Sequence, residues 1–140
     1  HALNEQLLAV AKRRARTEKM MSDHPFHQAA PRDFIIYSWG VIMENEGHQA
    51  PHFHPHGWLS GVYYIEVPDE ISDSDPERNG WLEFGRGDAR WHREETSMPT
   101  RQVLPKTGML ITFPSFFWHR TRPMHSKKPR ISFAFDIIPI

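Results

Sequence analysis

The pattern of hydrophobic and polar residues changes character after the first thirty residues of the chain. Leu3, Leu7, Val10 and Ala11 recur at helical spacing among strong helix formers, and an Arg/Lys cluster follows them. This spacing predicts a helix over residues 3–21 that serves for packing or as a linker. The next segment, SDHPFHQAAPRD, interrupts the helical pattern with two prolines.

Five short runs rich in β-branched and aromatic residues follow, separated by Gly, Pro and acidic turns. They are FIIYSWGVIM, WLSGVYYIEVP, GWLEFG, GMLITFPSFFWH and RISFAFDIIPI. Because no helical pattern lies between them, this part is predicted to be all-β, an antiparallel sandwich or barrel. We assign residues 1–30 to an N-terminal helix and linker and residues 31–140 to the β domain. Residues 68–80 are expected to form an exposed acidic loop, and residues 86–100 a second long polar excursion.

The last run, RISFAFDI, alternates most clearly between two faces, since a strand points successive side chains to opposite sides of its sheet. One face is apolar and is expected to pack. It carries Ile131, Phe133, Phe135 and Ile137. The opposite face is narrow and polar. It carries Arg130, Ser132, Ala134 and Asp136. An arginine aimed among such small neighbours indicates that its partner is an anion.

Charge and composition limit the classes of partner. The chain has 17 Lys plus Arg and 17 Asp plus Glu, so its net charge of zero favours neither nucleic acid nor an anionic membrane. Small molecules or particular protein surfaces are the expected partners, and the sequence indicates no oligomeric state. The absence of cysteine excludes disulfides, zinc ribbons and thiol nucleophiles. No apolar run approaches the ~20 residues that span a bilayer, and the start is too charged for a signal peptide, so a cytoplasmic protein is expected.

Three histidines stand in alternate positions in the segment PHFHPH, directly before a strand-like run. Residues i and i+2 of an extended segment point the same way, so His52 and His54 are expected to face one point. His56 would follow them unless Pro55 and Gly57 turn the chain first. Imidazole is a ligand for Fe, Zn, Cu and Ni, so the pair predicts half of a metal site.

A third ligand has to come from elsewhere in the fold, and His119 is the best candidate. It lies in the segment FPSFFWHR, where the strand that starts at Gly108 is expected to end. An imidazole beside Trp118 would be partly buried there. His48 and His56 remain as further histidines, and either could contact a metal ligand without binding the metal itself.

Four segments together resemble the 2-oxoglutarate/Fe(II)-dependent oxygenase family. They are HFHPHGWLSGVYYIEVP, GWLEFG, LPKTGMLITFPSFFWHRTRP and RISFAFDI. Members of that family carry H-x-H-P, L-S-G-V-Y-Y, P-x-x-G-x-L-x-x-F-P-S, a distal histidine and R-x-S in this order. The similarity spans roughly residues 39–137 and implies a double-stranded β-helix, the cupin-like jelly roll, for the domain at 31–140. The N-terminal helix would lie outside this domain or support it.

The resemblance implies that His52, His54 and His119 are the ligands of Fe(II). In the wider superfamily the near motif is H-x-D or H-x-E, which gives two histidines and one carboxylate. This sequence has a histidine where that carboxylate is expected. The third ligand therefore stays open between His54, His56 and a water molecule.

The resemblance also implies a site for 2-oxoglutarate. Arg130 and Ser132 would hold its remote carboxylate, because a guanidinium donates two hydrogen bonds to a carboxylate and the serine adds a third. Tyr64 resembles a tyrosine that donates to the same carboxylate in distantly similar prolyl hydroxylases. The alternative for Tyr64 is a core aromatic whose hydroxyl reaches the rim.

The activity implied by the resemblance is O2-dependent hydroxylation of a C–H bond, with 2-oxoglutarate converted to succinate and CO2. The substrate would be a small molecule or a protein side chain. Two alternatives to an oxygenase stay open. The first is a cupin-type metalloprotein, either an isomerase or a different dioxygenase, and it is disfavoured because Gly57 and Trp58 stand where cupins place a glutamate. The second is a non-catalytic jelly roll that binds a ligand or a partner.

Overall fold

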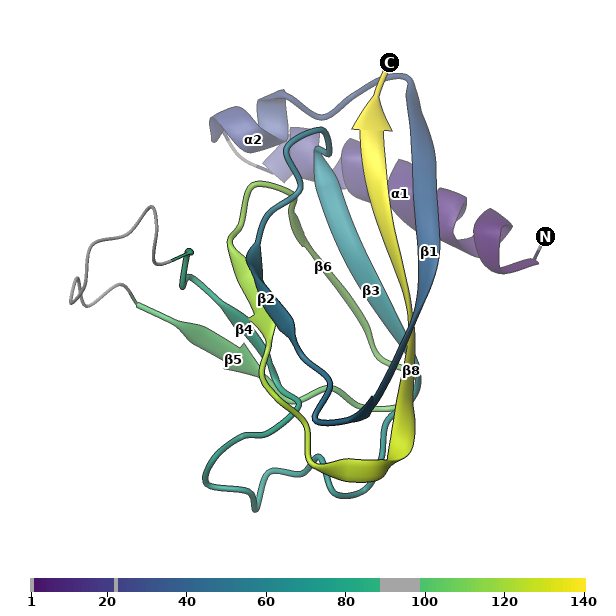
Figure 1. Cartoon of the computed structure of the whole chain (residues 1–140). Helices are drawn as coiled ribbons and strands as arrows, with labels where there is room; N and C mark the ends of the chain where they lie inside the picture. Colours follow the sequence, from purple (N-terminus) through teal and green to yellow (C-terminus); the bar gives the residue numbers. More distant parts are fainter. Residues whose placement is uncertain (1, 22, 89–98) are drawn as a thin grey trace.

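Two helices precede eight strands in the computed structural model, which describes residues 2–21, 23–88 and 99–140 (Figure 1). The helices are α1 (Ala2–Met21) and α2 (Pro25–Gln28). The strands are β1 (Phe34–Asn45), β2 (Gln49–His52), β3 (Leu59–Glu66), β4 (Leu82–Phe84), β5 (Arg101–Val103), β6 (Leu110–Pro114), β7 (His119–Thr121) and β8 (Ser126–Pro139). The helix predicted over residues 3–21 is confirmed as α1.

The strands form two four-stranded antiparallel sheets with the orders β1-β8-β3-β6 and β2-β7-β4-β5. Each sheet therefore places strands from the first half of the chain beside strands from the second half. This arrangement confirms the predicted jelly roll, an eight-stranded double-stranded β-helix. Its consequence for function is that residues far apart in sequence come to face each other between the two sheets.

Strand β8 is the centre of the first sheet, where it pairs with β1 on one side and β3 on the other. The predicted alternation of β8 is confirmed: Arg130 and Ser132 point between the sheets, while Phe135 and Ile137 are buried in a core on the outer side. Because the side-chain period of a strand is two, a slip of one residue would exchange these faces. The apolar face therefore fixes the direction in which Arg130 points.

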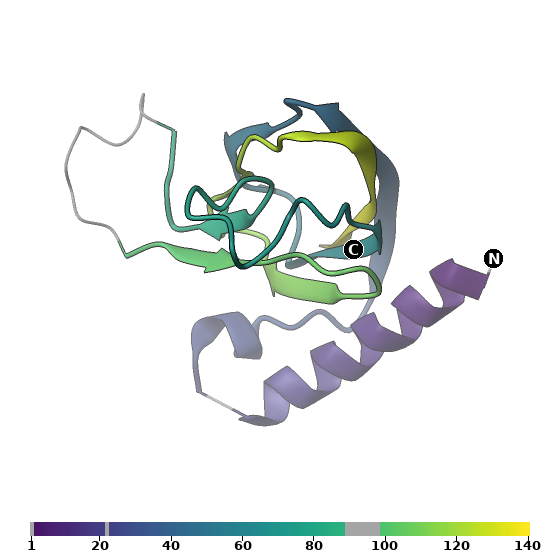
Figure 2. The same cartoon turned by 90° about the horizontal axis from the view of Figure 1, so that it is seen from below.

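Helix α1 covers that apolar face of the first sheet (Figure 2). Leu7 and Ala11, one helical turn apart, are buried in a cluster with Trp58, Leu59, Phe135 and Ile137. Arg14 of α1 also donates a hydrogen bond from Nη2 to Thr112 Oγ1 on β6, at 3.2 Å. The helix thus packs against the sheet instead of extending away from it. Neither of the two described helices is both long and apolar enough to cross a lipid bilayer.

A second core cluster lies among the loops at the other end of the sandwich. Met43, Ile71 and Met124 are its buried members. The expectation that residues 68–80 form an exposed loop is therefore correct only in part, because Ile71 is 6% exposed and anchors the loop. Most of the second polar excursion, residues 89–98, lies outside the described residues.

Gly61 on β3 gives a test of this packing. A Cβ at position 61 would lie 2.3 Å from Phe135 Cζ, whereas a Cβ at Gly40 on β1 would meet nothing within 4 Å. Neither glycine has a positive φ. We expect Gly61→Ala to lower the free energy of unfolding by about 1–3 kcal/mol through overpacking, and Gly40→Ala to leave it nearly unchanged. Chemical denaturation of both variants measures the difference, and equal stabilities would contradict the packing of Phe135.

Candidate functional site

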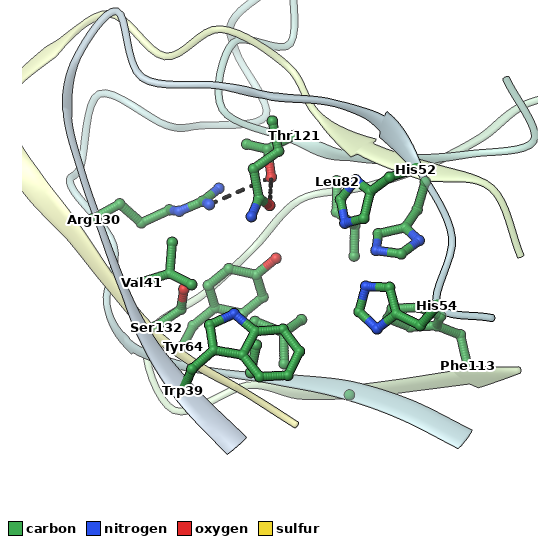
Figure 3. A pocket seen from close by; sticks show the side chains of 15 residues that line it. Trp39, Val41, His52, His54, Tyr64, Leu82, Phe113, Thr121, Arg130 and Ser132 are labelled. Carbon is green, nitrogen blue, oxygen red and sulfur yellow. Dashed lines mark hydrogen bonds between the residues drawn. The ribbon is translucent and has the colours of Figure 1, made fainter. Parts of the chain in front are cut away.

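A cavity lies between the two sheets (Figure 3). Both sheets contribute to its wall. The lining residues are Trp39, Val41, Gln49, His52, His54, Gly61, Val62, Tyr64, Leu82, Phe113, His119, Thr121, Arg130, Ser132 and Ala134. All six site residues predicted from the sequence are among them, so the fold brings the predicted site together around one space.

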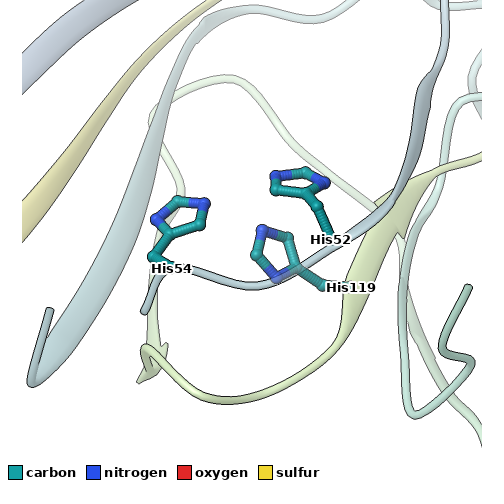
Figure 4. A group of neighbouring side chains, drawn as sticks. All are labelled: His52, His54 and His119. Carbon is teal, nitrogen blue, oxygen red and sulfur yellow. The ribbon is translucent and has the colours of Figure 1, made fainter. Parts of the chain in front are cut away.

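Three histidines meet at one side of this cavity (Figure 4). One ring nitrogen of each of His52, His54 and His119 lies within 4.8 Å of the others. Strand pairing explains the first contact, since His52 on β2 and His119 on β7 are register partners. His54 follows β2, and its backbone N–H donates to Ser115 O at 2.9 Å, which holds the segment against the first sheet. The group has the donor set and the spacing of a metal site.

The structure differs from the prediction for the histidines in two details. The strand that was expected to end at His119 is β6, which already ends at Pro114, and His119 begins β7 in the other sheet. His56 is exposed and lies outside the histidine group. Of the three possibilities for a third ligand, His54 is the one that the fold places beside His52 and His119.

The hydrogen bonds of the rings determine which nitrogen faces the common point. His52 Nδ1 lies 2.8 Å from Ala50 O, and His119 Nδ1 lies 2.9 Å from Phe117 O. A carbonyl oxygen only accepts hydrogen bonds, so both Nδ1 atoms carry the proton. The Nε2 atoms then keep their lone pairs, and these are the atoms available to a cation.

His54 has a different partner. Its Nδ1 lies 2.5 Å from Oδ1 of Asp136 on β8, and Ser60 Oγ donates to the same carboxylate oxygen at 2.6 Å. Sequence reasoning placed Asp136 on the same strand face as Arg130 but gave it no role. The missing signal was three-dimensional, because 82 residues separate the two partners in the chain.

Burial keeps the imidazoles of His52 and His119 uncharged. His119 is 5% exposed, and its burial, together with the neighbouring His52 and His54, lowers its pKa to about 4. Burial also lowers the pKa of His52. Both rings are therefore neutral at neutral pH, which is the form that binds a metal.

Arg130 lies on the other side of the cavity from His52 and His54 (Figure 3). It is 2% exposed. Nη1 donates to Gly80 O at 3.1 Å, Nη2 donates to Met43 Sδ at 3.0 Å and to Thr121 Oγ1 at 3.4 Å, and Nε has no partner. Within the described part of the chain no carboxylate lies within 4.0 Å of this guanidinium, and burial lowers its pKa. A buried cation with only neutral partners would be stabilised by an anion.

Tyr64 and Ser132 lie beside Arg130 and are register partners on β3 and β8. Tyr64 is 1% exposed, its ring lies 5.5 Å from Arg130 Cζ, and its hydroxyl points into the cavity (Figure 3). Burial raises the pKa of Tyr64, so the hydroxyl remains a hydrogen-bond donor. Ser132 is 2% exposed and lines the same space. Three donors of the predicted set thus surround one end of the cavity.

Other lining residues were missed by sequence reasoning. Thr121 Oγ1 accepts from Arg130 and donates to Gln49 Oε1 at 3.2 Å, which gives a polar wall between the guanidinium and the histidines. Trp39 lies on β1 with its ring centroid 5.8 Å from that of His54. The ring centroid of Tyr37, which is 62% exposed, lies 5.6 Å from that of Trp39 on the outer side. Alternation along β1 is the signal that could have found Trp39, whereas Gln49 and Thr121 lie in strands too short to show a pattern.

A protein-family model described as "Putative 2OG-Fe(II) oxygenase" matches residues 37–136. The resemblance noted in the sequence is therefore confirmed over most of the chain. No curated protein matches the sequence.

Several solved structures share the fold. A prolyl-4-hydroxylase from Pseudomonas putida is 16% identical with a TM-score of 0.53, and the match covers 74% of this chain and 51% of that one. An α-ketoglutarate dependent epimerase from nogalamycin biosynthesis is 16% identical with a TM-score of 0.56, over 76% and 47%. HygX from Streptomyces hygroscopicus, with nickel and 2-oxoglutarate bound, is 12% identical with a TM-score of 0.52, over 74% and 58%. The chain spans about half the length of these proteins, and at these identities the likeness establishes the fold alone.

The lowered pKa values of the buried histidines predict how stability depends on pH. An unfolded histidine titrates near 6.5, whereas His119 in the folded chain titrates at about 4. The unfolded state therefore binds more protons as the pH falls between these values, and the free energy of unfolding of the metal-free chain decreases by up to about 3 kcal/mol. Urea unfolding at several pH values measures this slope.

The variant His119→Gln provides the comparison, because it removes the titrating group. Its stability should decrease less between pH 7 and pH 4, while His48→Gln at an exposed position should retain the wild-type slope. Identical slopes for His119→Gln and wild type would contradict the assignment of the lowered pKa to His119.

Proposed function

This chain belongs to the 2OG-Fe(II) oxygenase family, and from that premise we propose that it is a non-haem Fe(II)- and 2-oxoglutarate-dependent dioxygenase that hydroxylates a C–H bond. The observation that carries the proposal is the set of side chains that line one cavity. Three imidazoles stand at one side, and at the other stands a buried guanidinium that has no counter-ion among the residues that the structure describes. The imidazoles are suited to a divalent cation and the guanidinium to a carboxylate, so a dicarboxylate could bridge the two ends of the cavity.

The donor set fits the metal. His52, His54 and His119 would hold Fe(II) through Nε2, since all three Nδ1 atoms already donate to oxygen acceptors. Imidazole nitrogen is a suitable ligand for Fe(II), and three ligands from one side leave room for other groups. When bound, the iron would supply the redox chemistry by which O2 oxidises a substrate while 2-oxoglutarate is converted to succinate and CO2.

The opposite end of the cavity fits a carboxylate. Arg130 would bind the remote carboxylate of 2-oxoglutarate, and the hydroxyls of Tyr64 and Ser132 would donate further hydrogen bonds to it. Binding there would give Arg130 a negative partner, which none of the described side chains provides. The keto acid end would then face the histidines, because the two groups of donors lie on opposite sides of the cavity (Figure 3).

The substrate would reach the site past aromatic side chains. Trp39 forms part of the cavity wall, and the exposed Tyr37 continues this surface outward. Such rings shield the reacting groups from water and offer an apolar contact to the substrate. A small molecule or a protein side chain is the expected substrate class, and the balanced charge of the chain does not favour nucleic acid or a membrane.

Removal of a metal ligand tests the proposal against a non-catalytic jelly roll. We expect His119→Ala to abolish the visible charge-transfer band of the anaerobic Fe(II)/2-oxoglutarate complex and the release of succinate in air. His56→Ala is the matched control, since His56 lies in the same histidine-rich segment but is exposed and outside the group. It should retain both signals. A folded wild-type chain that binds iron but shows neither signal would support the binding protein instead.

Replacement of Arg130 tests the cosubstrate site separately from the metal site. Arg130→Met should weaken the affinity for 2-oxoglutarate by about 1.5–3 kcal/mol, roughly 10- to 150-fold, because a charged hydrogen-bond partner is lost. The affinity for Fe(II) alone should stay nearly the same. The exposed Arg32→Met serves as the control. Calorimetric titration measures both constants, and an equal loss of iron binding would show that the role given to Arg130 is wrong.

A further inference from the structure

Asp136 is the one carboxylate that contacts the histidine group within the described part of the chain. It does not line the cavity, and it reaches the site only through the ring of His54. We propose that Asp136 is a positioning residue that supplies, through His54, the negative charge that three neutral imidazoles cannot give to a divalent cation. This inference rests on the proposed metal site and adds a role that the family resemblance does not assign.

The hydrogen bonds define the direction of this contact. Ser60 Oγ donates to Asp136 Oδ1 at 2.6 Å, and it also lies 2.8 Å from Ser115 Oγ. Ser60 Oγ lies 3.1 Å from His54 Nδ1 as well. Because a carboxylate oxygen only accepts hydrogen bonds, the proton between His54 and Asp136 lies on Nδ1 of the imidazole. Oδ1 accepts both hydrogen bonds, so His54 presents the lone pair of Nε2 to the cavity.

The surrounding packing holds this arrangement in place. The side chains of His54 and Asp136 are only 15% and 13% exposed, and Ser60 and Ser115 are buried. Gly57 lets the chain pass close to them, because a Cβ there would lie 2.4 Å from Ser115 Oγ and 3.7 Å from Asp136 Cβ. The carboxylate is therefore fixed by its neighbours, and its charge is little screened by water.

The other two histidines lack such a partner. His52 and His119 donate to the backbone carbonyls of Ala50 and Phe117, which are neutral. Three neutral rings leave both positive charges of a divalent cation uncompensated by the protein. A carboxylate hydrogen-bonded to one ring polarises it, raises its basicity and balances one of the charges. Asp136 thus distinguishes His54 from the other two ligands.

Cobalt(II) binding to the whole chain tests this role without any turnover, because the absorption of bound Co(II) reports both affinity and coordination. Asp136→Asn retains an oxygen that accepts from Nδ1 but removes the charge. We expect this variant to bind Co(II) about 10- to 100-fold more weakly than wild type, which is the typical loss of metal affinity when a hydrogen-bond partner of a metal ligand is replaced. Asp136→Glu should recover part of the affinity, and the exposed Asp73→Asn should bind like wild type.

The outcomes separate this inference from the proposed function. If wild type binds Co(II) and Asp136→Asn binds it equally well, only the role of Asp136 is overturned. If wild type itself binds no Co(II), the proposed metal site falls as well. A measurement on wild type covers the case in which Asp136→Asn does not fold: long-range 1H–15N spectra of the metal-free chain should show His54 protonated at Nδ1. Protonation at Nε2 would overturn the inference.

Discussion

The guanidinium of Arg130 is buried without a counter-ion among the described residues, and the organisation of this cavity depends on that constraint. Removing a cation from water costs several kcal/mol unless an opposite charge compensates for it. The described partners of Arg130 are a carbonyl, a thioether, a hydroxyl and the ring of Tyr64, none of which carries a negative charge. Apolar burial in the two core clusters is the favourable contribution to folding that opposes that cost. An anion that enters the cavity recovers part of it, so ligand binding and fold stability are coupled at this residue.

The same strand carries both ends of the proposed site. Arg130 and Asp136 share the inner face of β8, while Phe135 and Ile137 on the outer face are buried under α1. The packing of the helix therefore fixes the register of β8, and this register sets the separation between the anion-binding end and the carboxylate behind His54. A helix with no residue among the described lining of the cavity thus contributes to the geometry of that cavity.

Local patterns predicted much of this structure. The alternation of β8 and the i, i+2 relation of His52 and His54 depend only on strand geometry, and both can be read from the sequence. The start of β7 at His119 and the contact of His54 with Asp136 depend on how the two sheets pack, and no local pattern reports that. Ile71 shows the same limit, because its burial within a polar loop depends on Met43 and Met124.

The histidines do not all belong to one sheet. His52 and His119 are paired across β2 and β7 in the second sheet, whereas His54 is held by Ser115 and Asp136, which belong to the framework of the first. A cation bound by all three would act as a clasp across the seam of the sandwich. The ion would then join the two sheets at this edge, whereas the cluster of Met43, Ile71 and Met124 joins segments at the other end through apolar contacts.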